Sequence, residues 1–243
     1  MKLLQGFYSD VGNTRKVNQD SILCRLVENK KNAFAIVAVC DGIGGLEHGE
    51  IASRIVCECI NETFDEIASW IDVNTVDADI IVSHLKDAVE EANERVFDYK
   101  TTHGMQMGTT MSLLIVLREY YYIIQVGDSR VYLMRSDFLR QLTVDATVSS
   151  MASGRMKTYL NNYMGKDTDV WYTVADGSIR KEDLFVVCCD GFYHNLKVDD
   201  LAFDRKIFNN AGKANEKCAE LVRLMMDRGD KDNITVGMLY AKG

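Results

Sequence analysis

The chain has 243 residues, of which 47% are hydrophobic, so it can bury one substantial core. Its formal net charge is −8 and its isoelectric point is about 5.1. This balance argues against nucleic acid as a partner, because binding to a phosphate backbone needs clustered lysine and arginine. We therefore expect partners that are proteins or small molecules.

The course of the chain predicts one soluble domain. Polar residues appear between Met1 and Asp10, and no apolar run approaches the roughly 20 residues of a membrane span. Low-complexity segments, linkers and internal repeats are also absent. We expect a single domain over residues 1–243 that is cytoplasmic and monomeric and has no membrane partner.

Apolar runs bounded by Gly, Asn or Asp predict strands, and apolar residues at every third or fourth position predict helices. The predicted strands are Ser21–Leu26, Phe34–Cys40, Met111–Leu117, Tyr121–Val126, Val131–Met134, Leu184–Cys189 and Ile234–Tyr240. Helices are predicted over Ile51–Ala68, Ile81–Tyr99 and Lys213–Arg228. Because this order lacks strict strand–helix alternation, we predict an α+β fold, an α/β/β/α sandwich of two mainly antiparallel sheets flanked by helices.

Several aspartates lie where a predicted strand ends or begins: Asp41, Asp128, Asp190 and Asp232. A strand that stops at Asp-Gly brings a carboxylate to the sheet edge, and the glycine allows close approach of a ligand. Carboxylate oxygens suit Mg²⁺ or Mn²⁺, whereas the cysteines lack zinc-site spacing and are interpreted as structural thiols. Each Asp-Gly pair taken singly is also an ordinary turn signal, so the metal interpretation depends on their joint occurrence.

A loop rich in polar and charged side chains precedes the predicted strand Ser21–Leu26. It has the sequence SDVGNTRKVNQD, residues 9–20. The planar guanidinium of Arg15 could hold two oxygens of a phosphoryl group. A surface charge is an equally good interpretation of Arg15 alone.

Six short motifs follow one another along the chain: Gly12-x-x-Arg15-x-x-Asn18-x-Asp20, Asp41-Gly42-Ile43-Gly44-Gly45, Gly108-Thr109-Thr110, Gly127-Asp128-Ser129-Arg130, Asp190-Gly191 and Asp232-Asn233-Ile234-Thr235. In this order they resemble the metal-dependent protein phosphatase family (type 2C), in particular its compact bacterial serine/threonine branch. The resemblance covers nearly the whole chain, and its strength lies in the order of motifs that are individually weak.

The resemblance implies a centre of two Mg²⁺ or Mn²⁺ ions, with Asp41 bridging them and the carbonyl of Gly42 joining one. Asp190 and Asp232 would bind the other ion, and Asp128 matches an aspartate that supports a third ion in bacterial relatives. By the same resemblance, Asp20 orients the attacking water and Arg15 holds the substrate phosphate. Phosphoserine and phosphothreonine of proteins would then be hydrolysed by a hydroxide shared between the metals, with a serine/threonine kinase as the opposing enzyme.

Two departures from the family pattern stand out. Ile43 occupies the position where some relatives have a candidate general-acid histidine, and His48 and His194 are the nearby alternatives. Residues 142–170 lack the His-Pro pair of the longer flap of bacterial relatives, which leaves the substrate preference open. The alternative functions are a pseudophosphatase that binds phosphoproteins and a hydrolase of small phosphate esters.

Overall fold

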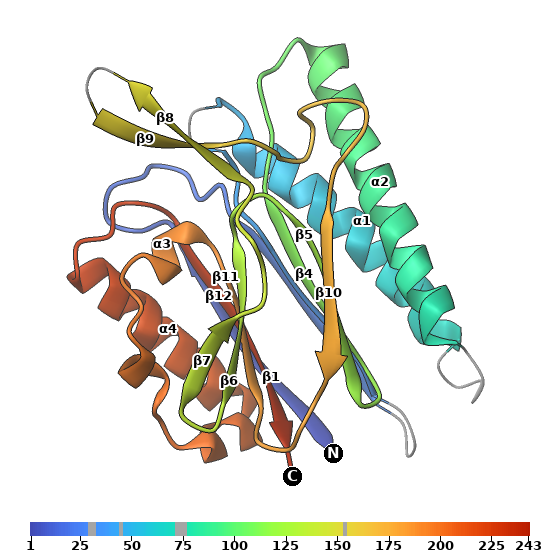
Figure 1. The fold of residues 1–243 in the computed structure, drawn as a ribbon, viewed down its shortest axis with the longest axis vertical. Coiled ribbons are helices and arrows are strands. Elements are labelled where there is room, and N and C mark those ends of the chain that lie inside the picture. Colours follow the sequence, from blue (N-terminus) through green and yellow to red (C-terminus); the bar gives the residue numbers. More distant parts are fainter. Residues whose placement is uncertain (29–32, 44–45, 71–76, 153–154) are drawn as a thin grey trace.

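The computed structural model describes residues 1–28, 33–43, 46–70, 77–152 and 155–243 (Figure 1). The strands are β1 (Lys2–Asp10), β2 (Ser21–Glu28), β3 (Ala33–Cys40), β4 (Met111–Leu117), β5 (Tyr120–Val126), β6 (Arg130–Arg135), β7 (Phe138–Gln141), β8 (Thr147–Ala152), β9 (Arg155–Leu160), β10 (Thr173–Ser178), β11 (Leu184–Cys188) and β12 (Ile234–Lys242). The α-helices are α1 (Gly49–Trp70), α2 (Ala78–His103), α3 (Asp190–Tyr193) and α4 (Ala211–Asp227), with 3-10 helices at Val198–Leu201 and Arg205–Asn209.

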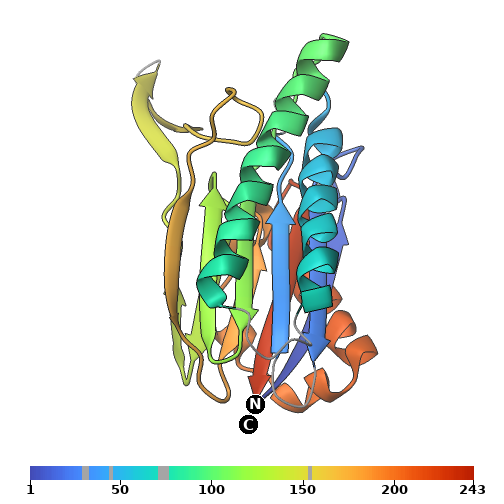
Figure 2. The same ribbon diagram turned by 90° about the vertical axis from the view of Figure 1, so that its right-hand side faces the viewer.

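Two five-stranded sheets form the centre of the molecule. The first has the order β1-β12-β11-β6-β7 and the second the order β10-β5-β4-β3-β2, and neighbouring strands in both are antiparallel. Strands β8 and β9 form a separate hairpin that projects from one end of the sheets (Figures 1 and 2).

Helices cover the outer face of each sheet. Helices α1 and α2 lie side by side on the second sheet, and α4 lies on the first (Figures 1 and 2). A Cβ atom on Gly6 of β1 would lie 2.7 Å from the Cβ of Ala214, so this glycine lets α4 approach the strand closely. The predicted α/β/β/α sandwich of two antiparallel sheets is confirmed.

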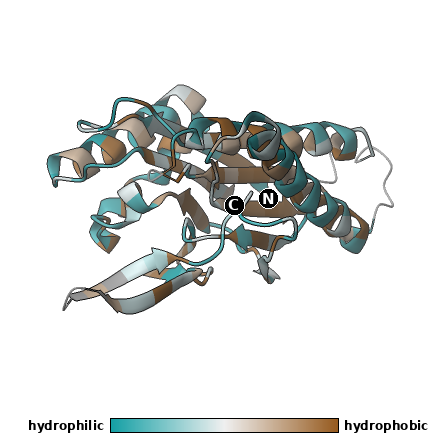
Figure 3. Ribbon diagram, turned by 90° about the horizontal axis from the view of Figure 1, so that it is seen from above, coloured by the Kyte–Doolittle hydropathy of each residue, from teal (hydrophilic) through white to brown (hydrophobic). Residues whose placement is uncertain are grey.

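Strand β3 shows why the central strands read as continuous apolar runs. Ala35, Val37 and Val39 pack into the core between the sheets, while Phe34 and Ile36 pack against the helices. Because both faces are buried, the sequence has no polar alternation. Figure 3 shows the hydrophobic residues concentrated on the central strands, with hydrophilic residues along the helices and the hairpin.

All seven predicted strands and all three predicted helices are present, with ends that differ by a few residues. The sequence missed β1, β7, β8, β9 and β10, and the short helices. The segment 142–170 contains the β8–β9 hairpin, where sequence analysis assigned no structure. Among the described residues no helix is long and apolar enough to cross a membrane, and the cysteines are free thiols, as expected.

Candidate metal centre

The end of β3 delivers Asp41 to the end of the sandwich that carries the hairpin. The Asp41 N–H donates to the Thr110 hydroxyl (3.1 Å), and its carbonyl accepts from the N–H of Thr110 (2.8 Å). The Gly42 N–H donates to the carbonyl of Gln19 (3.1 Å), and a Cβ on Gly42 would lie 2.5 Å from that oxygen. The backbone is therefore too close at this point for any side chain. Gly44 and Gly45 of the same motif lie outside the described residues.

Asn233 holds the N-terminal loop in place. Its side-chain NH₂ donates to the carbonyls of Val11 (2.9 Å) and Val17 (3.1 Å), and its side-chain oxygen accepts from the N–H of Gln19 (2.9 Å). The side chain is only 5% exposed, so these contacts are shielded from water. Gly12 has a φ of +74°, and a Cβ there would lie 2.2 Å from the Asp232 carbonyl. The loop and the start of β12 thus form one tightly packed unit.

Asp190 is the first residue of α3 and follows the buried strand β11. A Cβ on Gly191 would lie 2.2 Å from the Asn233 carbonyl, so α3 is packed directly on the chain before β12. The ends of β3, β11 and β12 are brought together in this way, together with the loop that carries Asp20.

Three potential metal-ligand atoms gather at this point. One side-chain atom from each of Asp20, Asp41 and Cys189 lies within 4.8 Å of the others. Asp20 is 9% exposed, and no hydrogen bond of ordinary geometry reaches its carboxylate oxygens from the described residues, although the Thr235 hydroxyl and the Cys189 thiol lie close by. Burial raises the pKa of Asp20 to about 7, and the neighbouring Thr235 hydroxyl and Cys189 thiol offset this rise in part.

The other carboxylates of the centre also repel one another. Burial raises the pKa of Asp41 well above its usual range, and the charges of Asp20, Asp190, Asp232 and Asp128 raise it further. The pKa of Asp190 is raised by burial and by Asp232, and burial raises the pKa of Asp128 to about 6. The structure thus brings together all five aspartates that sequence analysis selected.

This donor set fits a divalent cation. Carboxylates gathered without sufficient counter-charge are costly, and a bound cation would offset their mutual repulsion. Oxygen atoms dominate the set, which suits a hard ion, although the Cys189 thiol was not expected there. Cys189 is fully buried and accepts the N–H of Thr235 (3.1 Å), so packing is sufficient to explain its presence.

Arg15 lies at the outer side of the centre and forms an ion pair with Asp232, at 2.6 Å between Nη2 and Oδ2. This hydrogen bond raises the pKa of the guanidinium, against the opposing effect of burial. Arg15 is therefore next to the carboxylates, with an exposed side chain, as a phosphate-binding role requires.

Two cavities adjoin the carboxylates. The hairpin-side cavity, of about 520 Å³, is lined by residues that include Asp128, Asp190, Thr147 and Leu160. The arginine-side cavity, of about 470 Å³, is lined by Arg15, Asp190 and Asp232 among others. His194 lines both cavities. His48 instead lies just before α1, with its Nδ1 at 3.6 Å from a Glu50 oxygen.

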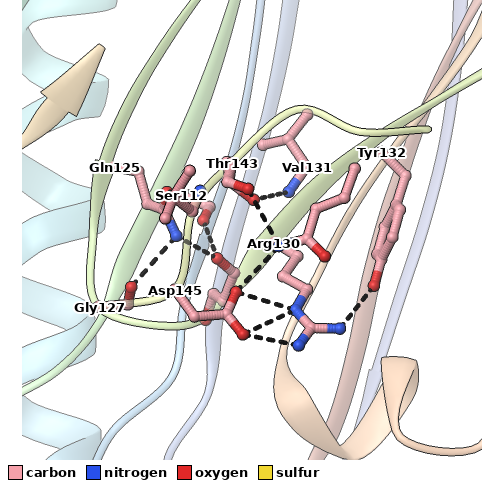
Figure 4. Close-up of polar contacts among 11 residues, drawn as sticks. Ser112, Gln125, Gly127, Arg130, Val131, Tyr132, Thr143 and Asp145 are labelled. Carbon is pink, nitrogen blue, oxygen red and sulfur yellow. Dashed lines mark hydrogen bonds and ion pairs between the residues drawn. The ribbon is translucent and has the colours of Figure 1, made fainter. Parts of the chain in front are cut away.

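A polar network that sequence analysis missed connects the Asp128 turn to the hairpin (Figure 4). The guanidinium of Arg130 donates to both carboxylate oxygens of Asp145, at distances from 2.6 to 3.2 Å, and to the hydroxyl of Tyr132 at 2.9 Å. It also lies 3.6 Å from the ring centroid of Tyr193, which follows Asp190 in α3. Arg130 thus joins the turn, the root of the hairpin and α3.

The same turn is fixed from the second sheet. The side-chain NH₂ of Gln125 donates to the carbonyls of Gly127 (3.1 Å) and Ser129 (2.9 Å), and the Ser112 hydroxyl donates to the Ser129 carbonyl (2.6 Å). Gln125 and Ser112 are almost fully buried. The Gly-Asp-Ser-Arg motif was the available signal for Arg130, but nothing in the sequence pointed to Asp145.

The fold and the site define an α+β sandwich protein with a buried carboxylate centre at one end of its two sheets. The chain matches the family model described as Protein phosphatase 2C over residues 13–232, and it belongs to that family.

Relatives and solved structures agree with this assignment. The chain is 26% identical to the serine/threonine phosphatase stp of Listeria welshimeri, over 95% of this chain and 92% of that protein. It is 24% identical to a putative protein phosphatase 2C-type of Streptococcus pyogenes, over 96% and 95% of the two chains. The structure of the S. agalactiae serine/threonine phosphatase is similar in fold, with a TM-score of 0.79, 23% identity and coverage of 99% and 100%.

Proposed function

We propose that this chain is a protein serine/threonine phosphatase that depends on Mg²⁺ or Mn²⁺. The observation that carries the proposal is the cluster of buried and half-buried aspartates, in which the pKa values of Asp41 and Asp190 are raised and the Asp20 carboxylate has no hydrogen bond of ordinary geometry from the described residues. Membership of the Protein phosphatase 2C family and the names of the bacterial relatives support the same reaction.

We assign the cation ligands to Asp41, the Gly42 carbonyl, Asp190 and Asp232, with Asp128 at a third ion. Bound divalent ions would lower the pKa of water and neutralise charge on the transferring phosphoryl group. In this proposal the Asp20 carboxylate accepts a hydrogen bond from the attacking water and so orients it, and the lack of another partner for its oxygens among the described residues supports this role.

Arg15 binds the substrate phosphate in this proposal. Its guanidinium can donate to two phosphate oxygens in one plane, and its exposed position beside Asp232 leaves it accessible from the arginine-side cavity. Water attacks phosphorus and the bond to the seryl or threonyl oxygen breaks; one proton of the water passes to that leaving oxygen and the other stays on the phosphate. Arg15 donates to the phosphoryl oxygens during this step, and bound cations would share in neutralising their charge.

We further propose that residues 1–243 act as one catalytic domain on phosphorylated proteins in the cytoplasm, as a monomer, opposed by a serine/threonine kinase. The shared core between the two sheets supports the single domain.

The first test is hydrolysis of p-nitrophenyl phosphate with Mn²⁺, with Mg²⁺ and with excess EDTA. We expect turnover with a divalent ion and none with EDTA. Absence of turnover with both ions, together with absence of metal binding by calorimetry, would contradict the proposal and favour a phosphoprotein-binding pseudophosphatase. Comparing kcat/KM for a phosphothreonine peptide and for small phosphate esters then separates a protein phosphatase from an ester hydrolase.

A further inference from the structure

A third cavity, of about 630 Å³, lies beside the chain that connects β9 to β10 and is separate from the residues proposed for catalysis. Its lining includes Asn161, Asp167, Asp169 and Trp171. Trp171 is 80% exposed. A tryptophan in this position is unusual on a free surface and common at the centre of protein interfaces.

The backbone around this Trp171 cavity is held firmly. Asn93 of α2, only 1% exposed, donates to the carbonyls of Asp167 (3.0 Å) and Thr168 (2.9 Å) and accepts from the N–H of Gly165 (2.7 Å). The side chain of Asn162 donates to the Trp171 carbonyl. The exposed ring therefore projects from a preorganised loop, which lowers the entropy lost when a partner binds.

An unpaired strand edge continues from the cavity. β10 is the edge strand of the second sheet, and among the strands of the described residues it pairs only with β5. Val174 of β10 is 58% exposed and Val144 is 73% exposed. Val144 lies beside the start of β10, because its N–H and the Thr173 hydroxyl both donate to the side-chain oxygen of Gln125. An extended segment can add to such an edge through main-chain hydrogen bonds.

The charges of the cavity favour a basic segment. Two acids, Asp167 and Asp169, line it together with one lysine, Lys166, whose ammonium donates to the Asn161 carbonyl at 2.6 Å. The ammonium of Lys100 on α2 interacts electrostatically with Asp167 and partly neutralises it. Asp169 is therefore the carboxylate of this cavity that can attract a basic side chain more strongly. An arginine or lysine side chain over the Trp171 indole would gain a cation–π contact beside this carboxylate. The net charge of −8 adds long-range attraction.

The Trp171 cavity and the metal centre lie on opposite faces of the hairpin root. Thr147 pairs with Leu160, and both line the hairpin-side cavity with Asp128. The adjoining pair, Ala146 and Asn161, is joined by a 2.8 Å backbone hydrogen bond and lines the Trp171 cavity. One strand pair thus separates the Trp171 cavity from the centre, so a single partner protein could contact both.

We propose that the Trp171 cavity and the β10 edge dock a basic, extended segment of the phosphoprotein substrate, outside the residues that enter the metal centre. The segment pairs with β10, and its arginine or lysine side chain stacks on Trp171 beside Asp169. The identity of the partner as a phosphoprotein rests on the proposed function.

Binding is tested without turnover, on a Trp70→Phe background that leaves Trp171 as the single tryptophan of the two in the chain. A short unphosphorylated peptide of alternating arginine and valine is titrated while the Trp171 emission is followed. We expect saturable binding that weakens with salt, and no binding of the matched glutamate–valine peptide. Calorimetry in the unmodified background should show affinity reduced roughly five- to thirtyfold by Trp171→Ala, and less by Asp169→Asn.

Phe138→Ala is the matched control, because Phe138 is also 80% exposed but lies at the start of β7. Equal binding of the two peptides, or equal effects of Trp171→Ala and Phe138→Ala, would overturn the proposal.

A kinetic test of the docking site depends on the proposed phosphatase function. For a phosphopeptide joined to the basic segment, Trp171→Ala should raise KM and leave kcat unchanged, with unchanged hydrolysis of p-nitrophenyl phosphate. If the unmodified protein hydrolyses no phosphate ester, the proposed function fails while the binding measurement still decides the docking site.

Discussion

The carboxylate centre and the Arg130 network adjoin one another, yet charged side chains are paired in the network and gathered with like charges in the centre. In the network, Arg130 and Asp145 are 24% and 22% exposed and meet at 2.6 Å, so each charge has its partner. In the centre, both oxygens of Asp20 lack a hydrogen-bond partner in the described part of the chain, and burial and mutual repulsion raise the pKa of Asp41. The charges of the network are paired within the chain, whereas we propose that those of the centre are balanced by a bound cation. This contrast separates the residues that stabilise the structure around the site from those that we propose to bind cations and substrate.

The strongest test of this contrast is Asp190→Asn. The amide keeps the shape of the side chain but removes a negative ligand, so we expect kcat for p-nitrophenyl phosphate to fall roughly a hundredfold or more. Circular dichroism should show an unchanged fold. A folded variant with normal turnover would remove Asp190 from the centre.

A smaller effect is expected for Arg15→Ala. Loss of a charged, two-pronged hydrogen-bond donor should raise KM for the phosphate ester by roughly ten- to a hundredfold. Arg15→Lys should recover only part of the loss, since an ammonium cannot present the planar fork. The exposed neighbour Lys16, changed to Ala, serves as the control, and equal effects at the two positions would show a general charge effect.

The same chemical change should act differently in the network. Asp145→Asn leaves the half-buried Arg130 without its counter-charge, so we expect a loss of about 1 to 3 kcal/mol in the free energy of unfolding by urea. Turnover of p-nitrophenyl phosphate should change much less than in Asp190→Asn. If Asp145→Asn abolished turnover without affecting stability, the division between structural residues and catalytic residues would be wrong.

The pH dependence of stability tests the buried carboxylate of Asp20 in the absence of a cation. Asp20 has a folded pKa of about 7 against 3.8 for the free side chain, so between these values the folded chain binds more protons than the unfolded chain. Its contribution to stability is therefore lost as the pH rises from about 4 to 7.

With EDTA present, we expect the Tm to fall by roughly 10 °C over this range, and less in Asp20→Asn. Scanning calorimetry at several pH values measures both. Addition of Mn²⁺ should restore the Tm at pH 7, because a ligand that binds only the folded state stabilises it. A Tm that rises with pH in EDTA, equally in both proteins, would contradict the assigned cause.

How far the sequence predicts the fold depends on burial. Strand β3 was found because it is apolar on both faces, whereas β10 was missed because it is an exposed edge strand and its Asp176-Gly177 pair reads as a turn. The interruption of β1 by Gln5-Gly6 and the polar residues of β8 had the same effect.

The site shows the corresponding limit. Asp41 and Asp190 were identified from their place at strand ends, because local sequence determines where a strand stops. The contact between Arg130 and Asp145 depends on how the root of the hairpin folds back on the Asp128 turn, and no periodicity records that geometry. The proposed docking role of Trp171 likewise depends on its exposure, which the sequence alone does not show.

The pairing of β1 with β12 has a consequence for how the protein is made. All nine residues of β1 pair with β12, from Lys2 with Lys242 to Asp10 with Ile234, and Asp232 lies just before β12. During synthesis β1 must therefore wait for a strand that leaves the ribosome after every other strand described. Such distant pairing slows folding. The Asp232 side of the centre can assemble only at this late step, so a nascent chain should remain unable to complete its cation site until synthesis has passed β12.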